Sequence, residues 1–86
     1  MSRVEVTRSE IQRLVRATPF HPFALKMENG DRVVIAHPEN IAFDPDAKEG
    51  AKWWDRFYAI SNGLVLFSNF GAVTSVALVD RGVPAA

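Results

Sequence analysis

Positions 57–79 read FYAISNGLVLFSNFGAVTSVALV, and this stretch contains no charged side chain. Turn-forming residues interrupt it at 61–63 and at 68–71, whereas a membrane-spanning helix needs about 20 mostly apolar residues in a row. The Asn62–Gly63 pair is typical of a type I′ turn in a two-residue β-hairpin, because both turn positions take a positive φ. We therefore predict strands at 56–60, 64–67 and 73–79.

The turn at Asn62–Gly63 pairs residue 61 with residue 64, and this register decides which side chains share a face of the hairpin. One face carries Tyr58, Ile60, Val65 and Phe67. The other face carries Ala59, Leu64 and Leu66. The interior of one small domain and one short helix cannot cover apolar residues on both faces of the hairpin. We therefore expect a second copy of the chain to cover the remainder.

The N-terminal part of the chain predicts a helix at 7–17. Thr7 and Glu10 have the S/T-x-x-E spacing of a capping box, in which each side chain satisfies a free amide of the first turn. One apolar stripe follows, formed by Ile11, Leu14 and Val15. Pro19 disfavours the helical conformation of the preceding residue, so the helix is expected to end before it.

A second hairpin is predicted between the helix and the centre of the chain. Its strands are expected at 24–28 and 31–37, joined by a type I′ turn at Asn29–Gly30 with residue 28 opposite residue 31. This register places on one face Phe23, Leu25, Met27, Val34 and Ala36. Pro38 predicts a bend after the second strand, because proline cannot donate to a ladder.

Length and composition limit the classes of function. The chain has 86 residues, which is enough for one domain. Its ten basic and ten acidic residues cancel, so a strong sequence-independent attraction to nucleic acid or to an anionic membrane is not expected. The chain has no cysteine, which excludes disulfides, thiolate metal sites and cysteine nucleophiles. No signal peptide is recognisable, so we expect a soluble, cytoplasmic protein.

These elements together predict one domain over 1–86. A helix at 7–17 is followed by about five strands between 23 and 79, with a polar loop at 44–55 and a tail at 80–86. Consecutive antiparallel strands with a bent second strand suit a small barrel. The predicted fold class is therefore α+β, mainly β: an N-terminal helix followed by a five-stranded, strongly bent antiparallel barrel.

Several motifs resemble known families. Residues 16–23 read RATPFHPF, which resembles the R-x-x-P-F-x-P-F start of a family of small, uncharacterised bacterial proteins, and NGDR at 29–32 with HPE at 37–39 continues that pattern. More loosely, Phe43–Asp44 and the strand at 73–76 resemble the two motifs of Sm-like (Hfq-like) proteins. That resemblance implies a small barrel of Sm-like or SH3-like type. It also implies that neighbouring copies pair by their edge strands in a ring, and it makes RNA a possible ligand.

The favoured function is a non-catalytic interaction or assembly module that forms a homo-oligomer. The residues expected to contact a partner are Trp53, Trp54, Leu64, Leu66 and Phe70. Adjacent residues of a strand point to opposite faces. We therefore expect one of the two tryptophans to fill the core and the other to face outward. Two roles stay open for the outward ring: it anchors a partner, or it packs under the polar loop or against a neighbouring subunit.

Two alternative functions stay open. The first is binding of RNA or single-stranded nucleic acid, with Arg8, Arg13 and Arg16 as a basic stripe on the helix. The second is a small-molecule or metal site at His21 and His37, although their spacing matches no known ligand pattern, so we predict no metal. No Ser/His/Asp arrangement and no phosphate-binding glycine loop is present, and we predict neither an enzyme nor a cofactor.

Overall fold

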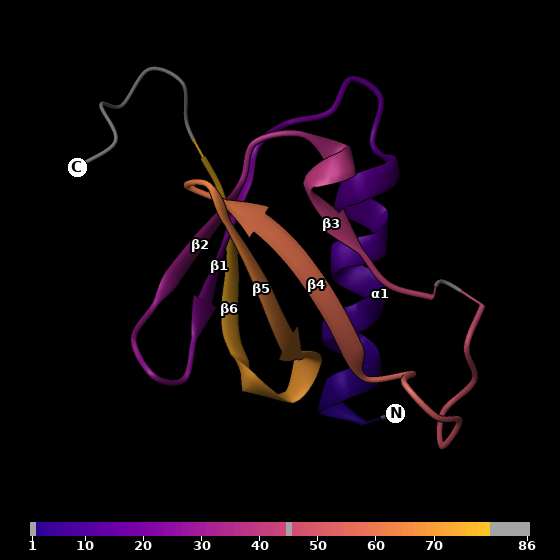
Figure 1. The fold of residues 1–86 in the computed structure, drawn as a ribbon. Coiled ribbons are helices and arrows are strands. Elements are labelled where there is room, and N and C mark those ends of the chain that lie inside the picture. Colours follow the sequence, from indigo (N-terminus) through magenta and orange to yellow (C-terminus); the bar gives the residue numbers. More distant parts are fainter. Residues whose placement is uncertain (1, 45, 80–86) are drawn as a thin grey trace.

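The computed structural model describes residues 2–44 and 46–79 (Figure 1). One α-helix, α1 (Arg3–Arg16), precedes six strands. In chain order the strands are β1 (Phe23–Met27), β2 (Arg32–Ile35), β3 (Ile41–Ala42), β4 (Arg56–Ser61), β5 (Leu64–Asn69) and β6 (Val73–Leu78). Two short 3-10 helices, η1 (Pro38–Asn40) and η2 (Phe70–Ala72), follow β2 and β5. The tail predicted at 80–86 lies outside the described residues.

The strands form two antiparallel three-stranded sheets, with the orders β2-β1-β6 and β3-β4-β5. The α+β class with an N-terminal helix is confirmed, but the prediction of a single five-stranded barrel is wrong. The bend predicted at Pro38 is present, because η1 begins at this residue, which has no N–H to donate to a ladder. The chain then resumes as β3 in the other sheet, and β5 and β6 are joined by η2 without pairing.

The helix begins one turn earlier than predicted. Its N-cap is Ser2, whose side-chain oxygen accepts a hydrogen bond from the N–H of Glu5 at 3.1 Å. Ser2 and Glu5 have the same S/T-x-x-E spacing as Thr7 and Glu10, so the sequence contains two candidate caps. The earlier cap adds a turn whose Arg3 guanidinium donates to the Val73 carbonyl at 2.9 Å, and this contact favours the longer helix.

The first hairpin has a different register from the predicted one. Leu25 lies opposite Val33, and the N–H of Met27 donates to the Asp31 carbonyl at 2.8 Å, so three residues rather than two form the loop. Gly30 takes the positive φ of 94°, whereas Asn29 does not, which excludes a type I′ turn. A shift of one residue moves every side chain to the opposite face. The buried face is therefore Phe23, Leu25, Met27, Val33 and Ile35.

The second hairpin has the turn and the register predicted from the sequence. Asn62 and Gly63 have φ values of 53° and 77°, as a type I′ turn requires, and Ser61 lies opposite Leu64. The register continues to the far end of β4, where Arg56 lies opposite Asn69. The predicted division of side chains between the two faces of this hairpin is therefore confirmed.

The core lies between the two sheets and α1. Its largest fully buried side chains are Phe23, Phe70, Ile11, Leu25 and Ile35. The aromatic rings of Phe57 and Phe43 pack against the Phe70 ring, with centroid distances of 4.9 Å and 5.2 Å. η2 thus anchors the end of β5 beneath α1. None of the described helices is long and apolar enough to cross a membrane.

Candidate interaction surface

The second hairpin presents an apolar surface to solvent, which we call the outer face. It consists of Tyr58, Ile60, Val65 and Phe67, whose exposed fractions are 43%, 41%, 54% and 82%. The register places Tyr58 opposite Phe67 and Ile60 opposite Val65, so the four side chains form two cross-strand pairs. The Tyr58 and Phe67 ring centroids lie 6.1 Å apart.

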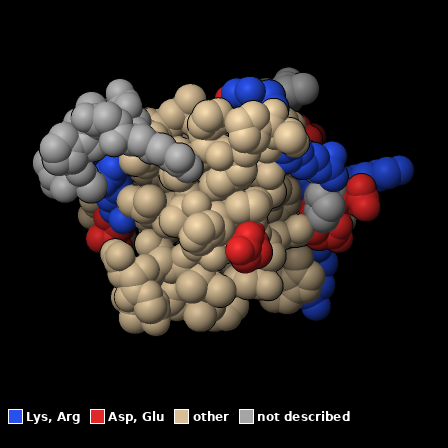
Figure 2. Space-filling model, turned by 90° about the horizontal axis from the view of Figure 1, so that it is seen from above, with Lys and Arg blue, Asp and Glu red and all other residues tan. Residues whose placement is uncertain are grey.

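The outer face carries no charge of its own, because the sequence has no charged residue from Phe57 to Val79. The nearest charged side chain on the same strand is Arg56, at the start of β4. The end of the molecule seen from above in Figure 2 is also mostly uncharged, with one acidic side chain near its middle and the other charged side chains at its margins. Four large apolar side chains grouped on an uncharged sheet face are typical of an interaction site.

Trp53 borders the outer face. Its side chain is 58% exposed, and its φ of 70° is uncommon for a bulky residue. The Arg56 guanidinium lies over the indole ring at 5.2 Å and the Lys52 ammonium at 5.5 Å. An open groove of about 630 Å³ runs from Trp53 to Tyr58 and Phe67. The groove extends the outer face with a third aromatic ring.

The other residues predicted to contact a partner have different environments. Leu64 is exposed beside the hairpin turn, and Leu66 is half-buried against the core. Phe70 is fully buried in the core, so its prediction as a contact residue is wrong. The tryptophans precede β4 and lie in a turn, where the alternation of strand faces does not apply. As a result Trp54 is half-buried and does not belong to the buried core.

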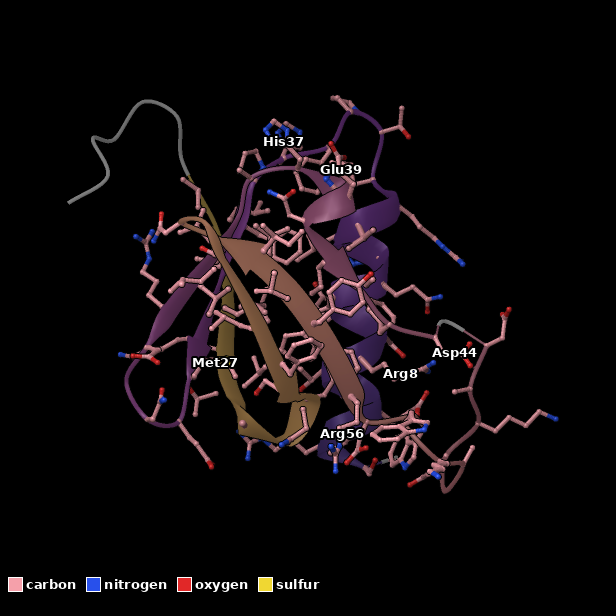
Figure 3. The ribbon with its side chains drawn as sticks, viewed as in Figure 1. Arg8, Met27, His37, Glu39, Asp44 and Arg56 are labelled. Atoms are coloured by element: carbon pink, nitrogen blue, oxygen red, sulfur yellow. The ribbon has the colours of Figure 1, made fainter. Side chains whose placement is uncertain are left out.

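The predicted basic stripe on α1 is not formed as expected. Arg8 is 4% exposed, and its guanidinium donates to the Asp44 carbonyl and lies 5.8 Å from the Phe43 ring centroid (Figure 3). Arg8 therefore fastens the helix to the chain after β3 and is not accessible to a phosphate. Arg13 is exposed and pairs with Glu10, which raises the pKa of Arg13 and lowers the pKa of the Glu10 carboxyl.

The histidines are separated from any cluster of ligands. Residues 2–44 and 46–79 contain no group of three or more His, Asp or Glu side chains that could hold a metal ion. His37 occupies the N-cap position of η1 without a side-chain capping bond, and Glu39 lies in η1 beside it (Figure 3). The Asp44 carboxylate accepts a hydrogen bond from the N–H of Asp46 at 3.0 Å, as in an Asx turn.

Comparison of the chain with protein-family models, with curated proteins and with solved structures gives no match. The two resemblances described above therefore stay predictions.

Proposed function

We propose that this protein is a non-catalytic interaction module that forms a homo-oligomer, in which the outer face of one copy packs on the outer face of another. The observation that carries this proposal is the group of four exposed apolar side chains on β4 and β5. The sequence pattern places these four residues on one face of the hairpin. The structure adds that no element of the described chain covers them.

The area of the surface supports a contact between two copies. An aromatic side chain has about 150–250 Å² of surface. The exposed fractions of the outer face thus correspond to roughly 400 Å², and Trp53 and Leu64 at its margins bring the surface to roughly 650 Å². Stable complexes bury about 800 Å² on each partner, so this surface is close to the size that specific association requires.

The absence of charge on the surface favours a second copy as the occupant. A two-fold contact places the same patch on both sides of the interface, so a patch that carried one sign of charge would face that same sign on its partner and be repelled. The outer face has no such charges, and its only charged neighbour on β4 is Arg56 at one end. Burial of apolar surface then drives the association.

Analytical ultracentrifugation across protein concentrations tests this proposal. The natural chain is expected to shift from monomer to dimer between about 5 µM and 500 µM, because association follows mass action. Phe67→Glu is expected to remain a monomer over this range. The matched control is Leu78→Glu, which places the same charge at an exposed position of β6 in the other sheet and leaves association unchanged.

Two results would overturn the proposal. One is a natural chain that stays monomeric at the highest concentration. The other is a dimer that Leu78→Glu dissociates while Phe67→Glu does not, which would place the contact on the other sheet. Circular dichroism of both variants shows whether the fold is retained.

A further inference from the structure

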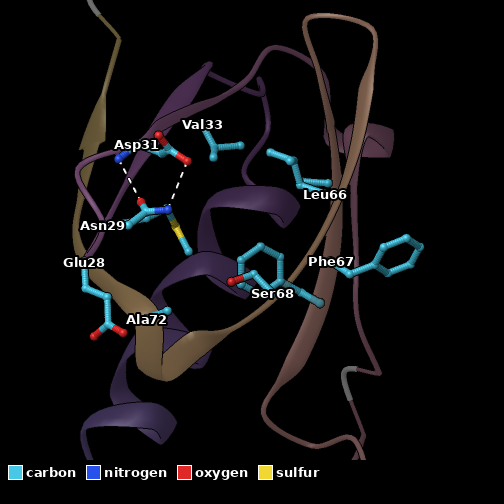
Figure 4. A pocket seen from close by; sticks show the side chains of 11 residues that line it. Glu28, Asn29, Asp31, Val33, Leu66, Phe67, Ser68 and Ala72 are labelled. Carbon is cyan, nitrogen blue, oxygen red and sulfur yellow. Dashed lines mark hydrogen bonds between the residues drawn. The ribbon is translucent and has the colours of Figure 1, made fainter.

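A second candidate site lies on the inner side of β5 and shares one lining residue, Phe67, with the outer face. It is a pocket of about 230 Å³ between the tip of the β1–β2 hairpin and β5 (Figure 4). Its apolar floor is formed by core residues, among them Val33, Phe57 and Ala59. An apolar cavity of roughly 150 Å³ can hold a benzene ring, so this pocket has room for one large apolar side chain.

The backbone of β5 beside this pocket is free to pair with another strand. In the described sheet β3-β4-β5, β5 has a neighbour on one side only. Ser61 and Leu64 flank a two-residue turn and form a hydrogen-bonded pair. Hydrogen-bonded pairs alternate with non-bonded pairs along an antiparallel ladder, so Val65 and Phe67 belong to non-bonded pairs with β4. Val65 and Phe67 therefore direct their N–H and C=O groups away from β4, toward the open edge. The Phe70 N–H, which donates to the Asp55 carbonyl at 2.8 Å, fits the same alternation.

The mouth of the pocket is acidic. Two of its eleven lining residues, Glu28 and Asp31, carry carboxylates, and none of the eleven is basic. The amide of Asn29 donates to the Asp31 carboxylate at 3.1 Å, and the N–H of Asp31 donates to the Asn29 side-chain oxygen at 2.9 Å (Figure 4). These two bonds hold the Asp31 carboxylate at the hairpin tip beside the opening.

We infer that β5 binds an extended peptide of a partner protein as an added strand, with one large apolar side chain in the pocket and basic residues near it. Main-chain bonds to an edge strand supply affinity in this mode, and a pocket for an alternate side chain supplies specificity. Residues two before and two after the anchor point to the same side of the added strand. Basic side chains at those positions approach Glu28 and Asp31. This inference concerns a different partner from the proposed self-association, and the pocket shares only Phe67 with the outer face.

The first test is a fluorescence-polarisation titration with labelled synthetic peptides. The probe is acetyl-Thr-Lys-Thr-Leu-Thr-Lys-Thr-amide, in which the central leucine is the anchor. Replacing this leucine with alanine is expected to weaken binding about tenfold or more, because three buried carbon atoms are lost. Replacing both lysines with glutamates is expected to abolish binding at low salt.

Backbone methylation of the peptide separates strand addition from simple insertion of the anchor. In antiparallel pairing, an anchor opposite Leu66 occupies a non-bonded position, and the residues next to it bond to Val65 and Phe67. N-methylation of a neighbouring threonine should then abolish binding, whereas N-methylation of the leucine should be tolerated. In parallel pairing the expected results are reversed: N-methylation of the leucine should abolish binding, and N-methylation of a neighbouring threonine should be tolerated. Tolerance of both changes would overturn strand addition.

Variants of the protein locate the site. Ser68→Leu fills the pocket from β5 and is expected to abolish peptide binding, while Ser75→Leu on β6 makes the same change away from the pocket and leaves binding intact. Glu28→Gln is expected to weaken binding at least threefold, with Glu39→Gln in η1 as its matched control. Equal binding by the two serine variants would overturn the inference, as would failure of the natural chain to bind the leucine peptide at about 1 mM.

A failure of peptide binding can be distinguished from a failure of the proposed self-association. Ile60→Glu places a charge on the outer face from β4, and Ile60 neither lines the pocket nor belongs to the strand that receives the peptide, so a monomeric Ile60→Glu protein is expected to retain peptide binding. Loss of peptide binding in that variant, with an unchanged circular dichroism spectrum, would show that the peptide occupies the outer face instead.

Discussion

Replacing Phe70 with alanine is expected to be the most informative test of the core. Phe70 is fully buried, and its ring packs against the rings of Phe43 and Phe57. Truncation of a buried phenylalanine typically lowers the free energy of unfolding by about 3–5 kcal/mol. A chain of 86 residues has a total stability of about 4–13 kcal/mol. The substitution should therefore remove a large part of the stability.

The assay is urea denaturation followed by circular dichroism at low micromolar protein concentration, where self-association contributes little. With a slope of about 1 kcal/mol per molar urea, Phe70→Ala should lower the unfolding midpoint by about 3 M or more. The matched control is Phe67→Ala, which removes the same ring from a side chain that is 82% exposed. Its free energy of unfolding should change by less than about 0.5 kcal/mol.

The two variants also separate stability from association. Phe67→Ala should weaken the dimer at high protein concentration while leaving the monomer stable. Equal losses of stability in the two variants, or a loss below about 1 kcal/mol in Phe70→Ala, would contradict the assignment of Phe70 to the core.

Three further predictions concern turns, helix charges and the connection between β3 and β4. Gly63→Ala should lower the free energy of unfolding by about 1–2 kcal/mol and the melting temperature by several degrees, because an alanine must adopt the positive φ of 77°. In an NMR pH titration, the carboxyl of Glu10 should titrate below its usual pKa, because the side chain of Arg13 donates a hydrogen bond to it, and Arg13→Gln should return the midpoint to the usual range. Since the folded pKa is lowered, this pair stabilises the fold above the unfolded pKa, and the contribution is lost as the pH falls through the folded pKa. Arg8→Leu should speed tryptic cleavage in the connection at 44–55 while the helix content stays constant, and an unchanged cleavage rate would show that Arg8 does not fasten this segment.

The sequence determined those features that depend on neighbouring residues. At Asn62–Gly63 the type I′ turn was predictable because its positive φ values suit asparagine and glycine, and the turn fixed the register of β4 and β5. The sequence also showed, through this register, which side chains share the outer face. The prediction that α1 ends before Pro19 is confirmed, because proline restricts the backbone conformation of the residue that precedes it.

Similar local patterns left other features undecided. Asn29–Gly30 has the same two residues as the later turn, but the chain forms a three-residue loop there instead of a two-residue type I′ turn. The three-residue loop is favoured because its register buries Val33 and Ile35 against the other sheet. Local preference for the turn is small compared with the burial of two large apolar side chains. The choice of Ser2 over a second cap candidate likewise depends on the contact of the first turn with Val73.

Only the tertiary structure decided which residues are available to a partner. Phe67 and Phe70 are the same residue type three positions apart, yet one is exposed and the other is buried, because η2 turns the chain inward after β5. Arg8 belongs to a polar face of the helix by sequence spacing, but the chain after β3 covers it. Exposure depends on which distant segments pack together, and no local pattern contains that information.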